Sequence, residues 1–327
     1  MKILVVGATG HVGSQVVKIL AEKGHDIRAL VRRESDTVHG APNSVEYVLG
    51  DLRDKRSLEK ALKDIDAVVS TANTIIPVGK NYSVKALNDK GYENLISAAE
   101  AAGVKQIVQS SVPKHIIESK VPELNGKRAI EARLERSPIA HSIIRNPAFL
   151  DVWLVMCGVK QLMGPDPHAT TRRPYGFMRL WQKLTGNFVK NWGIFLAPGG
   201  ADHGSVFVTT KDVAHMMAAM VGREDAYNKT FEAGGPEWLS WRDVANIISQ
   251  KTGKKIRIIP VPAWLASKNA ILMKPFMPSA YNVLRLLQFV ATWQPKWDSE
   301  PLAKQFGLPA QIKVSEYIDN NWNPETS

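Results

Sequence analysis

A glycine-rich turn near the start of the chain limits the folds that this sequence can adopt. Residues 7–13 read Gly-Ala-Thr-Gly-His-Val-Gly, with a glycine at every third position. The apolar run Lys2–Ala8 predicts a buried parallel strand, and the spacing of apolar residues in His11–Lys23 predicts a helix. Three glycines between a strand and a helix permit a tight turn, close backbone approach to a ligand and close helix–strand packing. The pattern predicts the first unit of a Rossmann-type sheet.

The rest of the first 150 residues alternates strand and helix signals. Such alternation predicts a doubly wound parallel α/β sheet with helices on both faces. We predict a sheet domain over 1–150 and a smaller, mixed α/β substrate or lid region over 151–327. Segments of that region, such as Ser205–Val208, are expected to rejoin the sheet. Further strands are predicted at Asp26–Arg32, Val45–Leu49, Asp66–Thr71, Gln106–Ser110, His141–Arg145 and Lys255–Val261, and helices at Arg56–Leu62, Ala86–Ala102, Gly126–Arg136 and after the capping pair Ser240 and Asp243.

Composition excludes several classes of protein. Cys157 is the single cysteine of 327 residues, so neither an intrachain disulfide nor a cysteine-based zinc site can form, and a reducing, cytoplasmic location is expected. No apolar run is long enough to cross a bilayer. The net charge of +11 is divided about evenly between the two halves, which argues against nucleic-acid binding. The histidines are scattered, so no metal site is predicted.

The glycine turn predicts a site for a dinucleotide. The amino terminus of the following helix offers N–H groups and a positive dipole end to a pyrophosphate. The residues expected to contact the cofactor here are Gly7, Thr9, Gly10, His11, Val12 and Gly13.

The end of the second predicted strand bears on the choice of cofactor. An NAD site usually places an acidic residue about 20 residues past the loop. Here Arg32 and Arg33 occupy that place, and the first acidic residue is Glu34. A guanidinium group suits a 2′-phosphate, so NADP(H) is preferred over NAD(H). The alternative for Arg33 is a solvated surface charge.

Two further strand ends are predicted to follow the cofactor. Asp51 and Leu52 close the third strand, where an adenine would lie; Asp51 would accept from its amino group or cap the next helix. Thr71, Ala72 and Asn73 end the fourth strand, in the crevice where open α/β sheets hold ligands.

Together these segments resemble the short-chain dehydrogenase/reductase superfamily in its atypical, NmrA-like branch. The resemblance rests on GATGHVG (7–13), ALVRR (29–33), GDLRD (50–54), STAN (70–73), VTTKDVA (208–214) and FEAGGP (231–236) followed by Ser240 and Trp241. It implies a Rossmann fold and NAD(P) binding. The branch includes both reductases and non-catalytic redox sensors.

The resemblance also implies where catalysis would take place. The superfamily uses Y-x-x-x-K, in which tyrosine gives the proton, but here Glu123 stands four residues before Lys127. Lys127–Glu131 and Ile143–Asn146 resemble the isoflavone reductase and phenylcoumaran benzylic ether reductase group, in which a lone lysine is catalytic. Lys127 would then act as acid/base or hold the nicotinamide ribose. The alternative is a surface lysine paired with Glu131.

Ser111 occupies the place of the superfamily's active-site serine and would polarise a substrate carbonyl, or it would only bond within its loop. His115 would supply the proton that the missing tyrosine cannot give, or it would be a surface histidine.

Two cationic, aromatic segments, 168–192 and 270–293, leave several interpretations open. They would form the wall of a pocket for a small apolar, even anionic, substrate, or contact an anionic membrane peripherally. Core packing or a homodimer interface are the alternatives.

The favoured hypothesis is an NADP(H)-dependent reductase that transfers hydride to an apolar carbonyl, quinone or activated alkene. The alternative is a non-catalytic NADP(H)-binding redox sensor or assembly factor.

Overall fold

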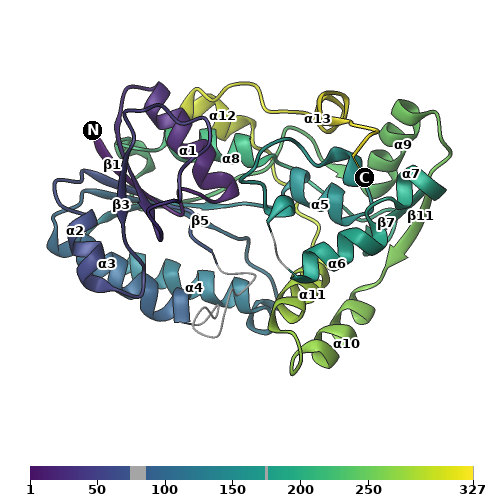
Figure 1. The fold of residues 1–327 in the computed structure, drawn as a ribbon, viewed down its shortest axis with the longest axis horizontal. Helices are drawn as coiled ribbons and strands as arrows, with labels where there is room; N and C mark the ends of the chain where they lie inside the picture. Colours follow the sequence, from purple (N-terminus) through teal and green to yellow (C-terminus); the bar gives the residue numbers. More distant parts are fainter. Residues whose placement is uncertain (74–85, 174–175, 327) are drawn as a thin grey trace.

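A seven-stranded parallel sheet forms the larger layer of the molecule (Figure 1). The computed structural model describes residues 1–73, 86–173 and 176–326. The strands lie in the order β3-β2-β1-β4-β5-β6-β9, and every neighbouring pair is parallel. This confirms the doubly wound α/β fold. The strands are β1 (Lys2–Val6), β2 (Asp26–Val31), β3 (Glu46–Leu49), β4 (Ala67–Ser70), β5 (Gln106–Ser111), β6 (Ala140–Arg145) and β9 (Lys229–Glu232).

Helices cover both faces of this sheet because its central strands are apolar on both sides. One apolar cluster joins the sheet to α1 (His11–Glu22), α8 (Thr210–Ala219) and α12 (Glu300–Phe306). A second cluster joins the opposite face to α2 (Lys55–Ala61), α3 (Tyr92–Ala101) and α4 (Pro122–Glu135). The sheet and these six helices are called the N-terminal lobe below.

The seventh strand differs from the expectation. Ser205–Val208 does not rejoin the sheet as a strand. Gly204–Ser205 forms β8, which pairs antiparallel with β10 (Leu239–Ser240), and Val208 makes only an isolated bridge to Phe149. β9 takes the place beside β6, where Phe231 packs against the first apolar cluster. The boundary at residue 150 stays a prediction.

Two helix boundaries also differ from the expectation. α4 begins at Pro122, four residues earlier than predicted, because proline suits the first position of a helix. Glu123 therefore lies in the first helical turn. The expected helix 86–102 is a π-helical turn over Ala86–Gly91 followed by α3.

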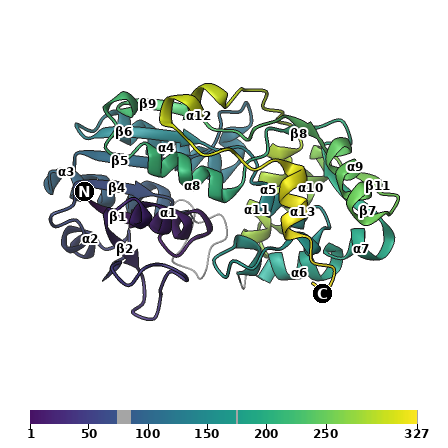
Figure 2. The ribbon, with the colours of Figure 1, turned by 90° about the horizontal axis from the view of Figure 1, so that it is seen from above.

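The remaining helices form a second lobe, called the C-terminal lobe below, and most of them pack around a third apolar cluster (Figure 2). The capping box of Ser240 and Asp243 at α9 is present as predicted. The predicted strand near 255–261 is β11 (Arg257–Val261), which pairs parallel with β7 (Ile194–Pro198). The helices are α5 (Leu150–Met156), α6 (Gly176–Thr185), α7 (Phe188–Trp192), α9 (Trp241–Thr252), α10 (Ala263–Met273), α11 (Pro278–Val290) and α13 (Val314–Asn321).

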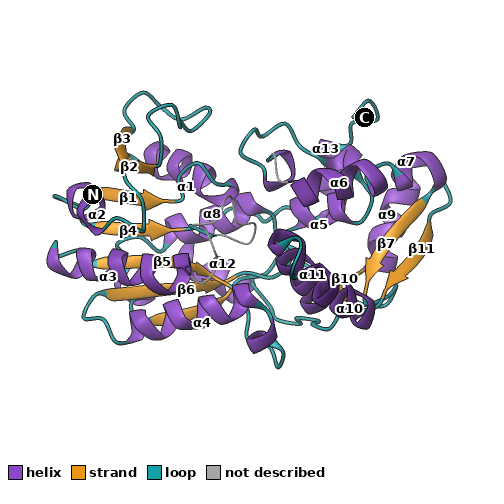
Figure 3. Cartoon of the chain, turned by 60° about the horizontal axis from the view of Figure 1, so that its bottom comes forward, coloured by secondary structure: helices purple, strands orange, loops and turns teal. Residues whose placement is uncertain are grey.

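The carboxyl ends of the sheet strands point toward the C-terminal lobe (Figure 3). Ligands of open α/β sheets bind at this edge. The two lobes therefore meet where the sequence predicts a cofactor. Over the described ranges, no helix is long and apolar enough to cross a membrane.

Substitution of Gly13 tests the packing of β1 against α1. A Cβ on Gly13 would clash with the Gly7 carbonyl group, so Gly13→Ala must move the helix or the turn. Such overpacking costs about 1–3 kcal/mol. We expect urea unfolding to show a free energy of unfolding lower by at least that amount.

Gly176→Ala is the matched control, because a Cβ there meets nothing within 4 Å. Equal stability of Gly13→Ala and the control would contradict the close packing.

Candidate functional site

The glycine turn brings three backbone segments together at the carboxyl end of β1. Gly7 has φ +85°, a conformation that favours glycine, and a Cβ there would lie 2.8 Å from the Ala72 nitrogen. The Gly10 N–H donates to the Gly7 oxygen at 2.8 Å. The Thr71 hydroxyl donates weakly to the Val6 and Gly7 carbonyls, at 3.3 and 3.4 Å. The turn thus places backbone atoms without side chains between the ends of β1 and β4.

The helix that follows the turn has no capping side chain at its N-cap. Gly10 is the N-cap residue of α1 and supplies no side-chain hydrogen bond. Helix N–H groups and the helix dipole at such a terminus favour an anion. This observation and the glycine turn fit the pyrophosphate of a dinucleotide. Val12 is buried in the first apolar cluster and thus anchors the turn.

A segment far along the chain closes over this turn. The His39 N–H donates to Nε2 of His168 at 2.8 Å, so Nδ1 of His168 carries the proton and donates to the Thr9 carbonyl at 3.1 Å. The Arg173 guanidinium group also donates to the Thr9 carbonyl. Residues 166–173 are called the covering segment below. The covering segment places a cation within reach of a phosphate bound at the turn.

Two other contacts hold the C-terminal lobe against α1. The Gln15 side-chain amide donates to Asp166 at 2.7 Å. Nε2 of His11 lies 3.4 Å from the Asp151 carboxylate, and Asp151 also accepts from the Thr210 hydroxyl. The side chain of His11 thus binds α5, and only its backbone faces the turn.

The two arginines after β2 lie on the surface. Arg33 donates to the Asp36 carboxylate at 2.8 and 3.0 Å, and this contact raises the pKa of its guanidinium group. Arg32 is also exposed. Both follow directly after β2, at the sheet edge that holds the glycine turn.

The alternative interpretation of Asp51, as the residue that caps the next helix, is wrong. α2 begins one residue after Asp54, whose carboxylate accepts from the Arg56 N–H at 3.1 Å and is therefore the N-cap. The Asp51 carboxylate accepts from the Arg53 guanidinium at 2.9 and 2.8 Å. Leu52 is buried in the second apolar cluster. A role of these two residues toward adenine stays a prediction.

A polar chain runs from the end of β4 to α3. The Tyr92 hydroxyl donates to the Ala72 carbonyl at 2.8 Å and lies 2.9 Å from the Ser70 hydroxyl. Nζ of Lys127 lies 5.9 Å from the centre of the Tyr92 ring, within the range of a cation–π contact. These contacts hold the end of β4 beside α4.

Lys127 and Glu123 form a buried pair on one face of α4. Residues four apart are neighbours on a helix. Lys127 is only 3% exposed and Glu123 only 2%, so the surface-lysine alternative is wrong. Glu131, its supposed partner, pairs instead with Arg128 and with Arg145 at 2.7 Å.

The environment of Glu123 favours its neutral form. Burial raises the pKa of its carboxyl group, and the charge of Lys127 and the Asn73 side chain offset this in part. Neither carboxyl oxygen meets the geometry of a hydrogen bond with a described residue. A buried acid near a cation, beside Asn73 after β4, can hold and release a proton. The missing tyrosine is evident from the sequence, but no local pattern indicates that the carboxyl in its place is buried.

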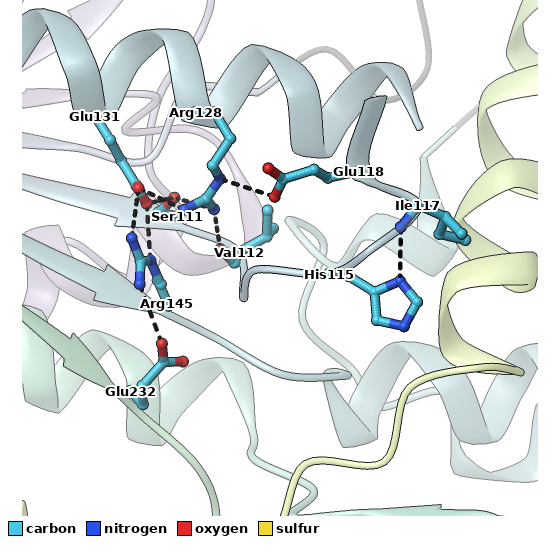
Figure 4. A network of polar contacts seen from close by, with 9 residues as sticks. All are labelled: Ser111, Val112, His115, Ile117, Glu118, Arg128, Glu131, Arg145 and Glu232. Atoms are coloured by element: carbon cyan, nitrogen blue, oxygen red, sulfur yellow. Dashed lines mark hydrogen bonds and ion pairs between the residues drawn. The ribbon is translucent and has the colours of Figure 1, made fainter. Parts of the chain in front are cut away.

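Ser111 belongs to a network of charges beside this pair (Figure 4). Its hydroxyl donates to Glu131 at 2.6 Å and is 2% exposed. Arg128 contacts Glu131 and the Val112 carbonyl, and Arg145 joins Glu131 to Glu232 at 3.2 Å. The network links β5, α4, β6 and β9. The structure thus brings Ser111 to Glu131, and its role toward a substrate stays a prediction.

His115 lies apart from the network (Figure 4). Its Nδ1 accepts from the Ile117 N–H at 3.2 Å, and its ring meets Phe289 of α11 edge-on at 5.3 Å. Burial lowers the pKa of the ring. His115 is thus half-buried between the lobes, and its catalytic role stays a prediction.

Side chains from both cationic, aromatic segments line one apolar cavity, while others of these segments are exposed. Side chains of α5, α6 and α11 surround an apolar cavity of about 20 Å³, the volume for about one water. Tyr175 lies outside the described residues. The lining residues are Trp153, Met156, Cys157, Phe177, Trp181, Leu196, Pro198, Val261, Val283, Leu284 and Leu287.

Metal ligands do not gather in the part of the chain that the structure describes. It contains no group of three or more histidine, cysteine, aspartate or glutamate side chains placed to hold a metal ion.

The parallel sheet and the glycine turn define a Rossmann-type α/β protein whose turn is suited to a dinucleotide. The chain belongs to the NmrA-like family, whose sequence profile matches residues 1–292.

Two sequence relatives differ in their described roles. Sterol demethylase protein B of Methylococcus capsulatus is 38% identical over 112 residues, which is 34% of each chain. The photosystem II assembly factor Ycf39 of Synechocystis is 24% identical over 94% of this chain and 86% of its own.

Two solved structures share the fold at full length. Citrobacter triphenylmethane reductase complexed with NADP(H) has a TM-score of 0.71 and 21% identity, covering 98% of this chain and 99% of its own. The Escherichia coli quinone oxidoreductase QOR2 complexed with NADPH has a TM-score of 0.72 and 19% identity, covering 98% and 100%.

The pH dependence of stability tests the state of Glu123. Burial raises its folded pKa above the unfolded value of about 4.3. The protonated Glu123 therefore stabilises the folded protein fully below the unfolded pKa, and this stabilisation is lost as the pH rises through the folded pKa. Glu123→Gln removes this titration. We expect the free energy of unfolding of the native protein, minus that of Glu123→Gln, to fall as the pH rises above the unfolded pKa of about 4.3.

Glu59→Gln, at an exposed position of α2, controls for the change in net charge. Parallel pH profiles of the native protein and Glu123→Gln would contradict a raised pKa.

Proposed function

We propose that this protein is an NADP(H)-dependent reductase that delivers hydride to an apolar carbonyl, quinone or activated alkene. The observation that carries the proposal is the buried Glu123–Lys127 pair at the sheet edge that also holds the glycine turn. A plain binding domain has no need to bury an acid and a base together, since burying charges costs free energy. The quinone oxidoreductase and the dye reductase of the same fold support this class of reaction.

Different residues would bind different parts of the cofactor. Gly7, Gly10 and Gly13 would let the backbone approach the pyrophosphate, and the start of α1 would bind it. Arg32 and Arg33 would take the 2′-phosphate, with Arg173 of the covering segment near the other phosphates. When bound, the reduced nicotinamide supplies the hydride.

The protein's part in the reaction is to supply a proton and to stabilise charge. The neutral carboxyl of Glu123 would give its proton to the substrate oxygen as negative charge develops there. Lys127 would stabilise the carboxylate that remains, since opposite charges attract strongly at a site shielded from water. Hydride and proton together convert a quinone to a hydroquinone, so the reaction balances. Glu123 would thus replace the tyrosine of Y-x-x-x-K.

The alternative function is a non-catalytic, NADP(H)-binding redox sensor or assembly factor. The missing tyrosine and the assembly factor Ycf39 among the relatives favour it. We further propose a reducing compartment, because Cys157 is a buried free thiol whose pKa is raised by burial. A cytoplasmic location and a homodimer remain predictions.

The preference for NADP(H) depends on the two arginines after β2. A double variant, Arg32→Ala with Arg33→Ala, should raise the Kd for NADPH about tenfold or more and change the Kd for NADH little, because only NADPH carries the 2′-phosphate. Fluorescence titration of each cofactor measures both constants.

Arg242→Ala, at an exposed arginine whose partner is Asp202, is the control for lost positive charge. An equal loss of affinity for NADPH and NADH would overturn the assignment.

The acid–base pair is tested by separating binding from turnover. Lys127→Ala and Glu123→Gln should each lower kcat with a quinone or enone acceptor by about 10²–10⁴-fold, as expected for a lost proton donor or its partner. The Kd for NADPH should change by no more than a few-fold. Stopped-flow absorbance of the reduced nicotinamide gives kcat.

Lys120→Ala, at an exposed lysine just before α4, is the matched control. Full turnover by Lys127→Ala would show that the catalytic assignment is wrong.

A further inference from the structure

α10 lies at the edge of the C-terminal lobe (Figure 1), and large apolar side chains on it and on the turn after it are exposed. Five exposed large hydrophobic residues lie within thirteen positions, and Trp264 is 60%, Ile271 61% and Phe276 79% exposed. Leu265 and Leu272 are the other two. A monomeric soluble protein rarely gathers such side chains on one element without a use for them.

α10 packs on the rest of the protein through two small residues, and most of its remaining surface is exposed or only partly buried. Only Ala266 and Ala270 of α10 are buried, and α10 packs on α11. These small residues allow close helix packing, while the long side chains on the other sides meet no core. The exposed side chains of α10 therefore do not belong to the hydrophobic core of this lobe.

Positive charge accompanies this apolar surface. Lys268 and Lys274 are exposed, and their ammonium groups lie 5.2 Å and 5.6 Å from the ring centres of Trp264 and Tyr281. No acidic residue occurs between Asp243 and Asp298. α10 and the neighbouring helix α11 therefore carry no acidic side chain.

We propose that α10 and the turn after it, residues 263–276, dock on the surface of an anionic lipid bilayer. Tryptophan, leucine and phenylalanine insert at the boundary of headgroups and acyl chains, while lysines contact anionic headgroups. α10 is 11 residues long, or about 16 Å, so it lies in the interface and does not span the membrane. This is a function separate from hydride transfer.

A second copy of the chain fits this surface less well. In a twofold dimer the same patch meets itself. Lys268 and Lys274 would then face their own counterparts, and neither α10 nor α11 carries an acidic side chain to compensate. An acidic bilayer supplies the opposite charge that the chain lacks.

Vesicle sedimentation of the full-length protein tests the proposal. The protein should sediment with vesicles of phosphatidylcholine and phosphatidylglycerol, and about tenfold less with phosphatidylcholine alone. Ile271→Ser with Phe276→Ser should lower the partition coefficient at least about tenfold, since two apolar side chains no longer enter the lipid. Lys268→Glu with Lys274→Glu should abolish the preference for anionic lipid.

Leu180→Ser with Leu184→Ser, at exposed leucines of α6, is the matched control. NADPH affinity, measured in parallel, reports that each variant is folded. Equal loss of binding by the control and the α10 variant would overturn the proposal, as would absence of binding by the native protein. A native dimer that the α10 variant dissociates, without vesicle binding, would assign the surface to a second copy instead.

Discussion

The close approach of β1 and α1 at Gly7 and Gly13 is the constraint on which the rest of the site depends. No side chain fits between the turn and the end of β4, so the strand end at Thr71–Asn73 lies directly beside the turn. That contact fixes the edge of the sheet where ligand-binding groups gather. The covering segment then reaches the same turn through the Thr9 carbonyl, which His168 and Arg173 both bind. One backbone turn thus positions groups from both lobes.

Two groups of buried ionisable side chains lie near the carboxyl ends of the sheet strands, and their environments differ. In the network of Ser111, Glu131, Arg128 and Arg145, the Glu131 carboxylate meets two cations and a hydroxyl donor, as a buried ion requires. Among the described residues, Lys127 and the Asn73 side chain are the groups that favour the charged form of Glu123, and burial raises its pKa. The first arrangement holds four elements together. The second favours a protonated carboxyl, which the proposed reductase reaction would use in place of the proton of the missing tyrosine.

Local sequence patterns predict the sheet well because a buried parallel strand and its covering helices each leave a periodic signal. The turn at 7–13, the strand ends and the capping box at Ser240 were all recognisable in this way. The seventh strand was misplaced because Ser205–Val208 and Lys229–Glu232 are both short, and only the pairing with β6 distinguishes them. The covering segment escaped prediction because its contacts join residues more than 120 positions apart. The burial of Glu123 likewise depends on α4 starting at Pro122.

The proposed function requires that the site reduces an acceptor as well as binding NADPH. The most direct measurement is the absorbance of NADPH over time with the native protein and a panel of quinones and enones. The account predicts that NADPH is consumed in proportion to the acceptor and that reduced product accumulates in equal amount. Tight binding of NADPH without oxidation by any acceptor would contradict it and favour a redox sensor or an assembly factor.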